Sequence, residues 1–142
     1  MKKLLALIAI FLIPFLITKT SKKSYTYNPS LDKYIKLARN KPKVSQQEIL
    51  AEIAKEWGDL GYEVVYQAYL ISKNESGFNP YAISKTGDFG LLQLHASTWC
   101  PFFKVIPEQL LSYSLNIKLA KKVYLRNGWC AWTTAKPLGL CN

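Results

Sequence analysis

The sequence predicts a mainly helical α+β domain preceded by an N-terminal segment of different character. Three segments place apolar residues three or four positions apart, at 45–57, 62–74 and 108–126, as one face of a helix requires. A fourth segment, 79–88, is rich in turn-forming residues and suits a small β-hairpin. The chain has 142 residues, of which 49% are hydrophobic, so one ordinary domain with a real core is expected.

The N-terminal segment begins with Met1, Lys2 and Lys3, followed by an apolar run over residues 4–17. Positive residues before a short apolar stretch are typical of a secretory signal, because a membrane span needs about 20 apolar residues. No clear small-residue cleavage site follows, so an uncleaved anchor is the alternative. Residues 1–18 are therefore predicted to be a signal peptide or membrane anchor. The protein is expected to be exported to the cell envelope or secreted, and the membrane is a partner in the anchored case.

Basic residues are concentrated before residue 44. Residues 1–43 contain ten Lys or Arg and one acidic residue, whereas residues 44–142 contain nine basic and eight acidic residues. We interpret 19–43 as a basic linker, with one short helix near 31–38, that is solvated or contacts an anionic surface. The later domain has no basic stripe interleaved with aromatics, so no nucleic-acid partner is predicted.

The compact domain is predicted over residues 44–142. Ser45 and Glu48 have the spacing of a capping box, and a helical stripe follows them at Ile49, Leu50, Ile53, Ala54 and Trp57. The second helix, 62–74, is expected to bury Val64, Val65, Ala68, Tyr69 and either Ile71 or Ser72. It should end at Gly77, because Pro80 forbids its continuation.

The rest of the domain continues the helical pattern. Residues 89–99 are expected to form another helix or a strand-to-helix passage. The last helix, 108–126, should end before Gly128 and turn inward Leu111, Leu115, Leu119, Val123 and Tyr124.

Three cysteines, Cys100, Cys130 and Cys141, are too few and too widely spaced for a zinc knuckle or ribbon, and no metal site is predicted. A Cys130–Cys141 disulfide is favoured over a pairing of Cys100 with either, because these two lie close in sequence near the C-terminus. Reduced, buried thiols are the alternative.

Glu75 is the candidate catalytic residue. It lies at the end of the second predicted helix, in phase with Ala68 and Ile71 on the buried face, so its carboxyl should be partly desolvated. Desolvation and the C-terminal end of the helix dipole both disfavour the charged form and raise the pKa of Glu75. A carboxyl that stays protonated nearer neutral pH is what a general acid needs.

The residues around Glu75 resemble a known signature. It consists of Glu75-Ser76-Gly77-Phe78-Asn79-Pro80, then Ala82, Ser84, Gly87-Asp88-Phe89-Gly90-Leu91-Leu92-Gln93-Leu94 and Trp99. This pattern is similar to that of the lysozyme-like superfamily, particularly its soluble lytic transglycosylase branch. Residues 88–94 and Trp129-Cys130-Ala131-Trp132 also resemble segments of animal-type lysozymes. The resemblance covers about 64–132.

The resemblance implies a lysozyme-like domain that cleaves the β-1,4 bond between N-acetylmuramic acid and N-acetylglucosamine in peptidoglycan, without a cofactor. Glu75 would protonate the glycosidic oxygen, and Gly77 and Gly90 would let the chain pass close to the sugar. The substrate-binding candidates are Ser84, Phe89, Gln93, Trp129 and Trp132.

Several of these candidates have a structural alternative. Ser84 could order the hairpin instead, and Gln93 could satisfy loop backbone instead of an N-acetyl group. Trp129 would pack against Glu75 and sustain its raised pKa, as a tryptophan does beside the catalytic glutamate of lysozyme. His95, the only histidine, is expected to be a polar loop residue without a catalytic role.

Asp88 separates two mechanisms. A hydrolytic muramidase uses a second carboxylate, and Asp88 is the possible one here. A lytic transglycosylase uses one Glu, because the muramic acid 6-hydroxyl attacks its own anomeric carbon. The motif favours the transglycosylase, although the Ala-Tyr-Asn-Ala-Gly-type segment of many transglycosylases is missing, which leaves the stabilising tyrosine unassigned.

Two further alternatives concern role rather than motif. A catalytically inactive glycan-binding module would keep the fold alone, but Glu75 within its full motif favours an enzyme. An anchored factor that opens the wall for a secretion or phage apparatus would differ in partners rather than chemistry. The sequence makes no prediction of oligomeric state.

Overall fold

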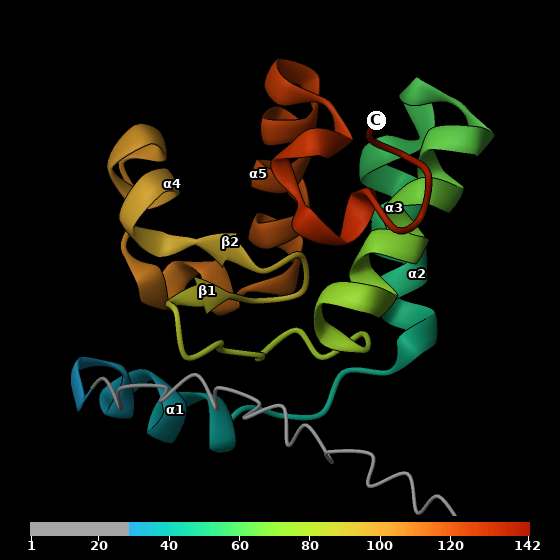
Figure 1. Cartoon of the computed structure of the whole chain (residues 1–142). Helices are drawn as coiled ribbons and strands as arrows, with labels where there is room; N and C mark the ends of the chain where they lie inside the picture. The colour runs from blue at the N-terminus through green and yellow to red at the C-terminus, as the bar shows by residue number, and fades with distance from the viewer. Residues whose placement is uncertain (1–28) are drawn as a thin grey trace, which may run out of the picture.

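A computed structural model of the chain describes residues 29–142 and confirms a mainly helical α+β fold (Figure 1). The predicted signal or anchor lies outside the described residues. The α-helices are α1 (Asp32–Arg39), α2 (Gln46–Trp57), α3 (Tyr62–Ser76), α4 (Ala96–Phe103) and α5 (Tyr113–Asn127). The strands are β1 (Asp88–Phe89) and β2 (Leu94–His95). Short 3₁₀ helices, η1 to η5, cover Pro29–Leu31, Gly58–Leu60, Pro107–Leu111, Trp129–Ala131 and Thr133–Ala135.

Helix α2 begins at the predicted capping box. The Glu48 amide donates to Ser45 Oγ at 3.2 Å, and the Ser45 amide donates to the Glu48 carboxylate at 2.8 Å. The helix buries Ile49, Ile53 and Trp57 and packs against α3 and α5. Ala54 is exposed, contrary to the predicted stripe, because this face of α2 points away from both neighbours.

Helix α3 ends where the sequence predicts. Gly77 adopts a left-handed conformation, with φ of 60°, and its amide donates to the Lys73 carbonyl. A left-handed residue at this position is the usual end of a helix, and glycine adopts it without strain. The helix therefore presents Glu75 in its last turn.

The predicted helix over 108–126 is instead two elements. Residues Pro107–Leu111 form the 3₁₀ helix η3, and α5 starts at Tyr113. Ser112 between them is extended, with ψ of 113°, and its hydroxyl accepts the Leu115 amide as an N-cap. Because the Ser112 side chain caps a new helix, the backbone breaks at this residue even though the apolar pattern continues through it.

The hairpin lies later in the chain than predicted. Residues 79–87 form turns and one antiparallel bridge, in which Ile83, within the segment predicted for the hairpin, pairs with Phe89. The two strands follow at 88–95, where Asp88 pairs with His95 and Phe89 with Leu94. Two residues with positive φ, Gly90 at 79° and Gln93 at 47°, turn the chain between the strands. Strand β2 runs directly into α4, so the predicted strand-to-helix passage is confirmed.

Residues near both ends of the described range, 29–142, are held in place by specific contacts. Helix α1 forms near the predicted place, and the Tyr34 ring packs edge-on against Phe89 at 5.2 Å between ring centres. The boundary at residue 44 stays a prediction, but α1 belongs to the packed structure. Near the other end, Cys130 and Cys141 form the favoured disulfide, and Cys100 is a buried free thiol. Within residues 29–142, no helix has the length and apolar character to cross a bilayer.

Candidate active site

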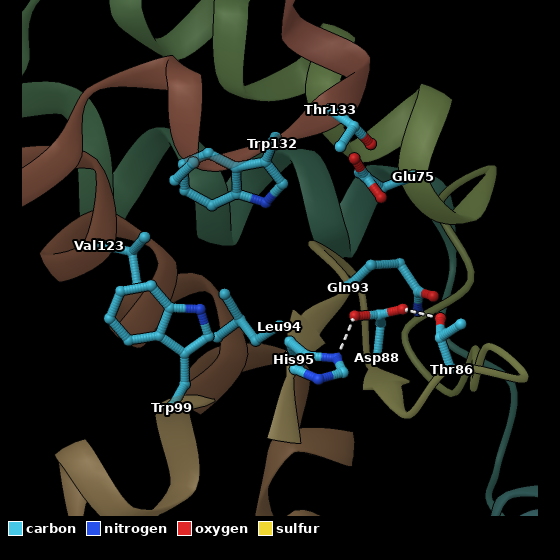
Figure 2. A pocket seen from close by; sticks show the side chains of 11 residues that line it. Glu75, Thr86, Asp88, Gln93, Leu94, His95, Trp99, Val123, Trp132 and Thr133 are labelled. Atoms are coloured by element: carbon cyan, nitrogen blue, oxygen red, sulfur yellow. Dashed lines mark hydrogen bonds and ion pairs between the residues drawn. The ribbon is translucent and has the colours of Figure 1, made fainter. Parts of the chain in front are cut away.

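A cavity of about 300 Å³ lies where the end of α3, the β-hairpin and the residues after α5 meet (Figure 2). We call residues 128–142 the C-terminal loop. The cavity is large enough for a small ligand. Its walls are formed by Glu75, Thr86, Asp88, Gln93, Leu94, His95, Trp99, Val123, Ala131, Trp132 and Thr133. The structure thus brings together Glu75, Asp88, Gln93 and Trp132 from three separate parts of the sequence.

Glu75 is half-buried at the wall of this cavity, as its helical phase predicts. Its Oε1 accepts a hydrogen bond from the Thr134 hydroxyl at 2.6 Å. Burial raises the pKa of Glu75, the Thr134 hydrogen bond lowers it, and the nearby charge of Asp88 raises it, for a net increase. A carboxyl with a raised pKa is suited to donate a proton near neutral pH.

Ser76, the second residue of the Glu-Ser pair, fixes the end of α3 against the hairpin loop. Its hydroxyl lies 2.7 Å from the Leu91 carbonyl and 3.1 Å from the Ser72 carbonyl. The Leu91 contact joins the helix that carries Glu75 to the loop between β1 and β2. The position of Glu75 relative to the hairpin is thereby set by its neighbour in sequence.

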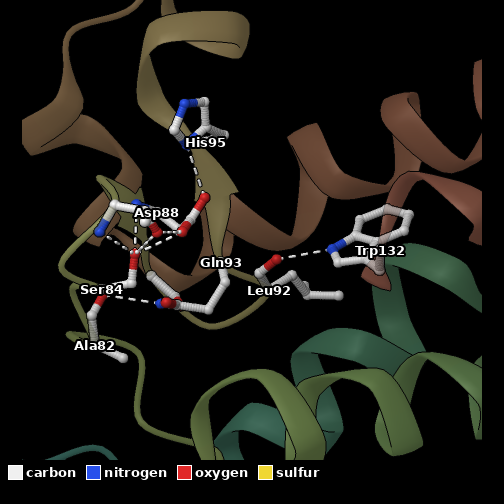
Figure 3. A network of polar contacts seen from close by, with 9 residues as sticks. Ala82, Ser84, Asp88, Leu92, Gln93, His95 and Trp132 are labelled. Carbon is white, nitrogen blue, oxygen red and sulfur yellow. Dashed lines mark hydrogen bonds and ion pairs between the residues drawn. The ribbon is translucent and has the colours of Figure 1, made fainter. Parts of the chain in front are cut away.

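Asp88 lies in a dense network on the hairpin side of the cavity (Figure 3). Its Oδ2 accepts hydrogen bonds from the hydroxyls of Ser84, at 2.5 Å, and Thr86, at 2.6 Å. Its Oδ1 lies 2.8 Å from His95 Nδ1. Burial raises the pKa of Asp88, but the hydrogen bonds from Ser84, Thr86 and His95 outweigh it, so the pKa is lowered. Asp88 is thus held as a carboxylate.

The expectation for His95 needs correction. The residue lies on β2, directly opposite Asp88 in the hairpin register, rather than in a loop. It lines the cavity and pairs with the Asp88 carboxylate. The separation of seven residues gave no signal of this pair, because the hairpin register was not predicted.

Gln93 lines the cavity, but its side-chain amide nitrogen is hydrogen-bonded to backbone carbonyls of the surrounding loops. Its Nε2 donates to the Gly90 carbonyl at 2.8 Å and to the Ala82 carbonyl at 3.1 Å. These bonds stabilise the positive φ of Gln93 and join the turn after α3 to the hairpin. The structural alternative for Gln93 is therefore present, and binding of an N-acetyl group stays a prediction for its remaining oxygen.

The two tryptophans of the C-terminal loop have different surroundings. Trp129 stacks on Trp57 at 5.4 Å between ring centres, and its Nε1 donates to Gln67 at 2.7 Å. Trp129 is not among the residues that line the cavity, so the wall beside Glu75 is not built from it as expected. Trp132 lines the cavity instead and donates from Nε1 to the Leu92 carbonyl at 2.8 Å. Both rings are buried in the core, and they differ in the neighbours that they contact.

Ser84 and Phe89 also lie outside the walls of this cavity. Ser84 orders the hairpin through Asp88 and Thr86, which is its structural alternative. Phe89 is buried against Tyr34 and lines an adjoining hollow of about 310 Å³ beside α1. Direct substrate contact by either residue stays a prediction.

Gly90 is required by a close approach within the protein rather than by the sugar. A side chain there would collide with the Leu110 carbonyl and the Asn116 amide. Asn116 is fully buried on α5, donates to the carbonyls of Phe89 and Leu110, and accepts the Leu92 amide. This one side chain fixes the hairpin loop to α5.

Three hydroxyl residues at the site, Thr86, Thr133 and Thr134, were not predicted from the sequence, nor was the role of Asn116. Thr86 and Thr133 line the cavity, and Thr134 binds Glu75. Their only sequence signal is nearness to matched motifs, in the turn before Asp88 and directly after Trp132. Within residues 29–142, no group of His, Cys, Asp and Glu side chains is placed to hold a metal ion.

Comparison with protein-family models matches residues 52–125 to the Transglycosylase SLT domain. This segment includes Glu75, the hairpin and Trp99, and it ends before the C-terminal loop. Comparisons with curated proteins and with solved structures gave no match. Because the matched segment is slightly more than half of the chain, this protein belongs to the transglycosylase SLT domain family of the lysozyme-like superfamily, whose members generally act as peptidoglycan lytic transglycosylases.

Proposed function

We propose that the protein is a lytic transglycosylase that cleaves the β-1,4 bond between N-acetylmuramic acid and N-acetylglucosamine, with Glu75 as its single acid and base. The observation that carries this proposal is the contrast between the two carboxyl groups of the cavity. Glu75 is desolvated and has a raised pKa, whereas both oxygens of Asp88 are occupied by hairpin donors. Family membership supports the peptidoglycan substrate.

In the first step, Glu75 donates its proton to the glycosidic oxygen as the bond to the muramic acid C1 breaks. The N-acetylglucosamine leaves with a free 4-hydroxyl, and positive charge develops at C1 and the ring oxygen. Glu75 is then a carboxylate beside that charge, in a cavity that is walled by Trp132, Trp99 and Leu94. The opposite charges attract each other, and the partial burial of Glu75 strengthens that attraction.

In the second step, the Glu75 carboxylate accepts the proton of the muramic acid 6-hydroxyl as O6 attacks C1. The product is a 1,6-anhydro sugar, Glu75 is protonated again, and no water is consumed. One carboxyl group is sufficient because it acts as acid and then as base.

Hydrolysis by a muramidase mechanism is the second candidate. It is favoured by one observation, namely that Asp88 lines the same cavity and its pKa is lowered, so that it is ionised when Glu75 is protonated. A retaining or inverting hydrolase needs such a pair. We place it second because a nucleophile or base needs a carboxylate oxygen free to approach the sugar or a water molecule.

We further propose export to the cell envelope or secretion, through the predicted leader in residues 1–18, either cleaved or kept as an anchor. The Cys130–Cys141 disulfide supports this location, because such bonds persist mainly in oxidising compartments outside the cytosol. The glycan strands that the enzyme would cleave are found in the same location.

Mass spectrometry of muropeptides released from purified peptidoglycan tests the reaction. The transglycosylase proposal predicts 1,6-anhydro ends, which are one water lighter than reducing ends. Release of reducing ends alone would establish the hydrolase instead. Absence of any soluble product from wild-type protein would refute both reactions and favour a glycan-binding module.

A further inference from the structure

One wall of the candidate active site is built from a loop that a disulfide closes. Ala131, Trp132 and Thr133 line the cavity, and Thr134 binds Glu75. All four lie between Cys130 and Cys141, which are bonded to each other. The loop follows the segment matched to the family, which ends at residue 125, so the family match assigns it no role.

Thr134 determines which oxygen of Glu75 is available for proton transfer. Its hydroxyl donates to Oε1 at 2.6 Å, which is a short hydrogen bond. When Thr134 donates to Oε1 of the protonated carboxyl, Oε1 is the carbonyl-type oxygen and the proton resides on Oε2. Rotation of the carboxyl group would break the bond, and the acid proton is therefore held in one direction.

The position of Thr134 depends on a short and irregular stretch of chain. It lies in the 3₁₀ helix η5, which is held by the buried Ala135 and by a hydrogen bond from the Leu140 amide to the Ala135 carbonyl. No α-helix or strand covers residues 128–142. The disulfide joins both ends of the loop and limits the conformations that it can adopt. Cys130 is exposed, so the bond is open to reductants in solution.

We propose that Thr134 is a positioning residue for Glu75 and that the Cys130–Cys141 disulfide keeps it in place, so that the enzyme is less active when this bond is reduced. The proposal rests on the proposed role of Glu75. Reduction by a dithiol transfers two electrons and two protons. The Cys130–Cys141 bond breaks to give two thiols, and the dithiol becomes a disulfide. The loop is then free to move Thr134 away from Oε1.

The first test compares Thr134→Val and Thr134→Ser in the full chain, with peptidoglycan as substrate. Loss of one hydrogen bond should lower kcat about three- to tenfold in the valine variant, while serine should restore most of the rate. The alkaline limb of the pH–rate profile should move to higher pH in the valine variant, because the lost bond favoured the carboxylate. The other titratable groups of the cavity, Asp88 and His95, are the same in all variants. Thr98→Val, on the exposed surface of α4, is the matched control.

The second test reduces the disulfide. Wild-type protein in dithiothreitol and the double variant Cys130→Ser/Cys141→Ser should both show the rate loss and pH shift of Thr134→Val. Reduction of the Thr134→Val variant should cause no further loss, because the contact is already absent. Full activity with an unchanged pH profile after reduction would overturn the role of the disulfide. Global unfolding by circular dichroism would also overturn it, since the bond would then determine folding rather than position.

A third measurement does not require activity. The Glu75 carboxyl can be titrated by NMR with carbon-13 label in its side chain, and its pKa should be higher in Thr134→Val than in wild-type protein. An unchanged titration together with an unchanged rate would overturn the role of Thr134. If wild-type protein releases no muropeptide, the proposed function fails, while this titration still decides whether Thr134 controls Glu75.

Discussion

The end of α3 and the β-hairpin each present one carboxyl group to the same cavity, and they surround it in opposite ways. Glu75 is half-buried and has one hydroxyl partner, Thr134. Asp88 has three partners, two hydroxyls and an imidazole, that come from its own turn and the facing strand. The pKa of Glu75 is therefore raised, mainly by burial, while hydrogen bonds lower that of Asp88 despite its burial.

This difference shows how a shared cavity separates two chemically similar groups. A group that must give and take a proton needs few fixed partners, because each donor to its charged form makes protonation harder. A group that holds a hairpin together benefits from many partners and a permanent charge. On this basis Glu75 is the proton-transfer group, and Asp88 organises Ser84, Thr86 and His95 around the cavity.

The largest expected effect comes from Glu75→Gln. The amide keeps the size of the side chain and can still accept the Thr134 hydrogen bond, but it has no acidic proton. Activity on peptidoglycan should fall by at least about 10²- to 10⁴-fold, the usual contribution of general acid–base catalysis. Clearing of a wall suspension at the wild-type rate, by a folded variant, would remove Glu75 from the mechanism.

A smaller effect is expected from Asp88→Asn. If Asp88 is organisational, the variant should keep activity within about tenfold of wild type, because Glu75, the proposed proton-transfer group, is unchanged. Its product should still be the 1,6-anhydro sugar. An inactive variant, combined with reducing-end products from wild-type protein, would instead place both carboxyl groups in a hydrolytic mechanism.

The contrast between the two regions also marks what the sequence could predict. Glu75 was placed correctly because its position depends on helical phase and on the end of α3 at Gly77, which are local properties. The family resemblance was carried by the same continuous stretch of chain, and the family match confirms it.

Contacts between distant segments were not predictable in this way. The Thr134 hydroxyl reaches Glu75 across 59 positions, and Asn116 reaches the hairpin across 24 to 27 positions. No sequence pattern around Thr134 or Asn116 predicts the distant residue with which its side chain forms a hydrogen bond. The surroundings of Trp129 were not predictable for the same reason, since they are set by tertiary packing; substrate contact by Trp129 stays a prediction.

Exchanging these two tryptophans for phenylalanine would sharpen the comparison on the Glu75 side. Trp132→Phe thins the wall of the cavity and leaves the Leu92 carbonyl without its partner, so more water should reach Glu75. The alkaline limb of the pH–rate profile should then move to lower pH, with a rate loss of a few fold. Trp129→Phe, which alters the stack on Trp57, should lower the free energy of unfolding without moving the profile. The same pH shift in both variants would show that the two rings are not distinct in function.

The smallest expected effect is on stability, and the two carboxyl groups should give opposite signs. The folded-state pKa of Asp88 is lowered, so its contribution to stability is present above its unfolded pKa and is lost as the pH falls through the folded value. Asp88→Asn should therefore lower the free energy of unfolding by about 1 kcal/mol at about pH 7, a value that allows for the partial exposure of the side chain. At about pH 3 the loss should be smaller.

Glu75 should behave in the reverse manner. Its folded-state pKa is raised, so its ionisation opposes folding once the pH rises above the unfolded value. Glu75→Gln should thus match or exceed wild-type stability at about pH 7. The difference should disappear below about pH 4, where Glu75 becomes protonated in both the folded and the unfolded wild-type protein. Urea unfolding of the two variants and wild-type protein at both pH values measures these differences. If both substitutions destabilise the protein equally near neutral pH, the two carboxyl groups are structurally equivalent, and the division of roles between α3 and the hairpin is wrong.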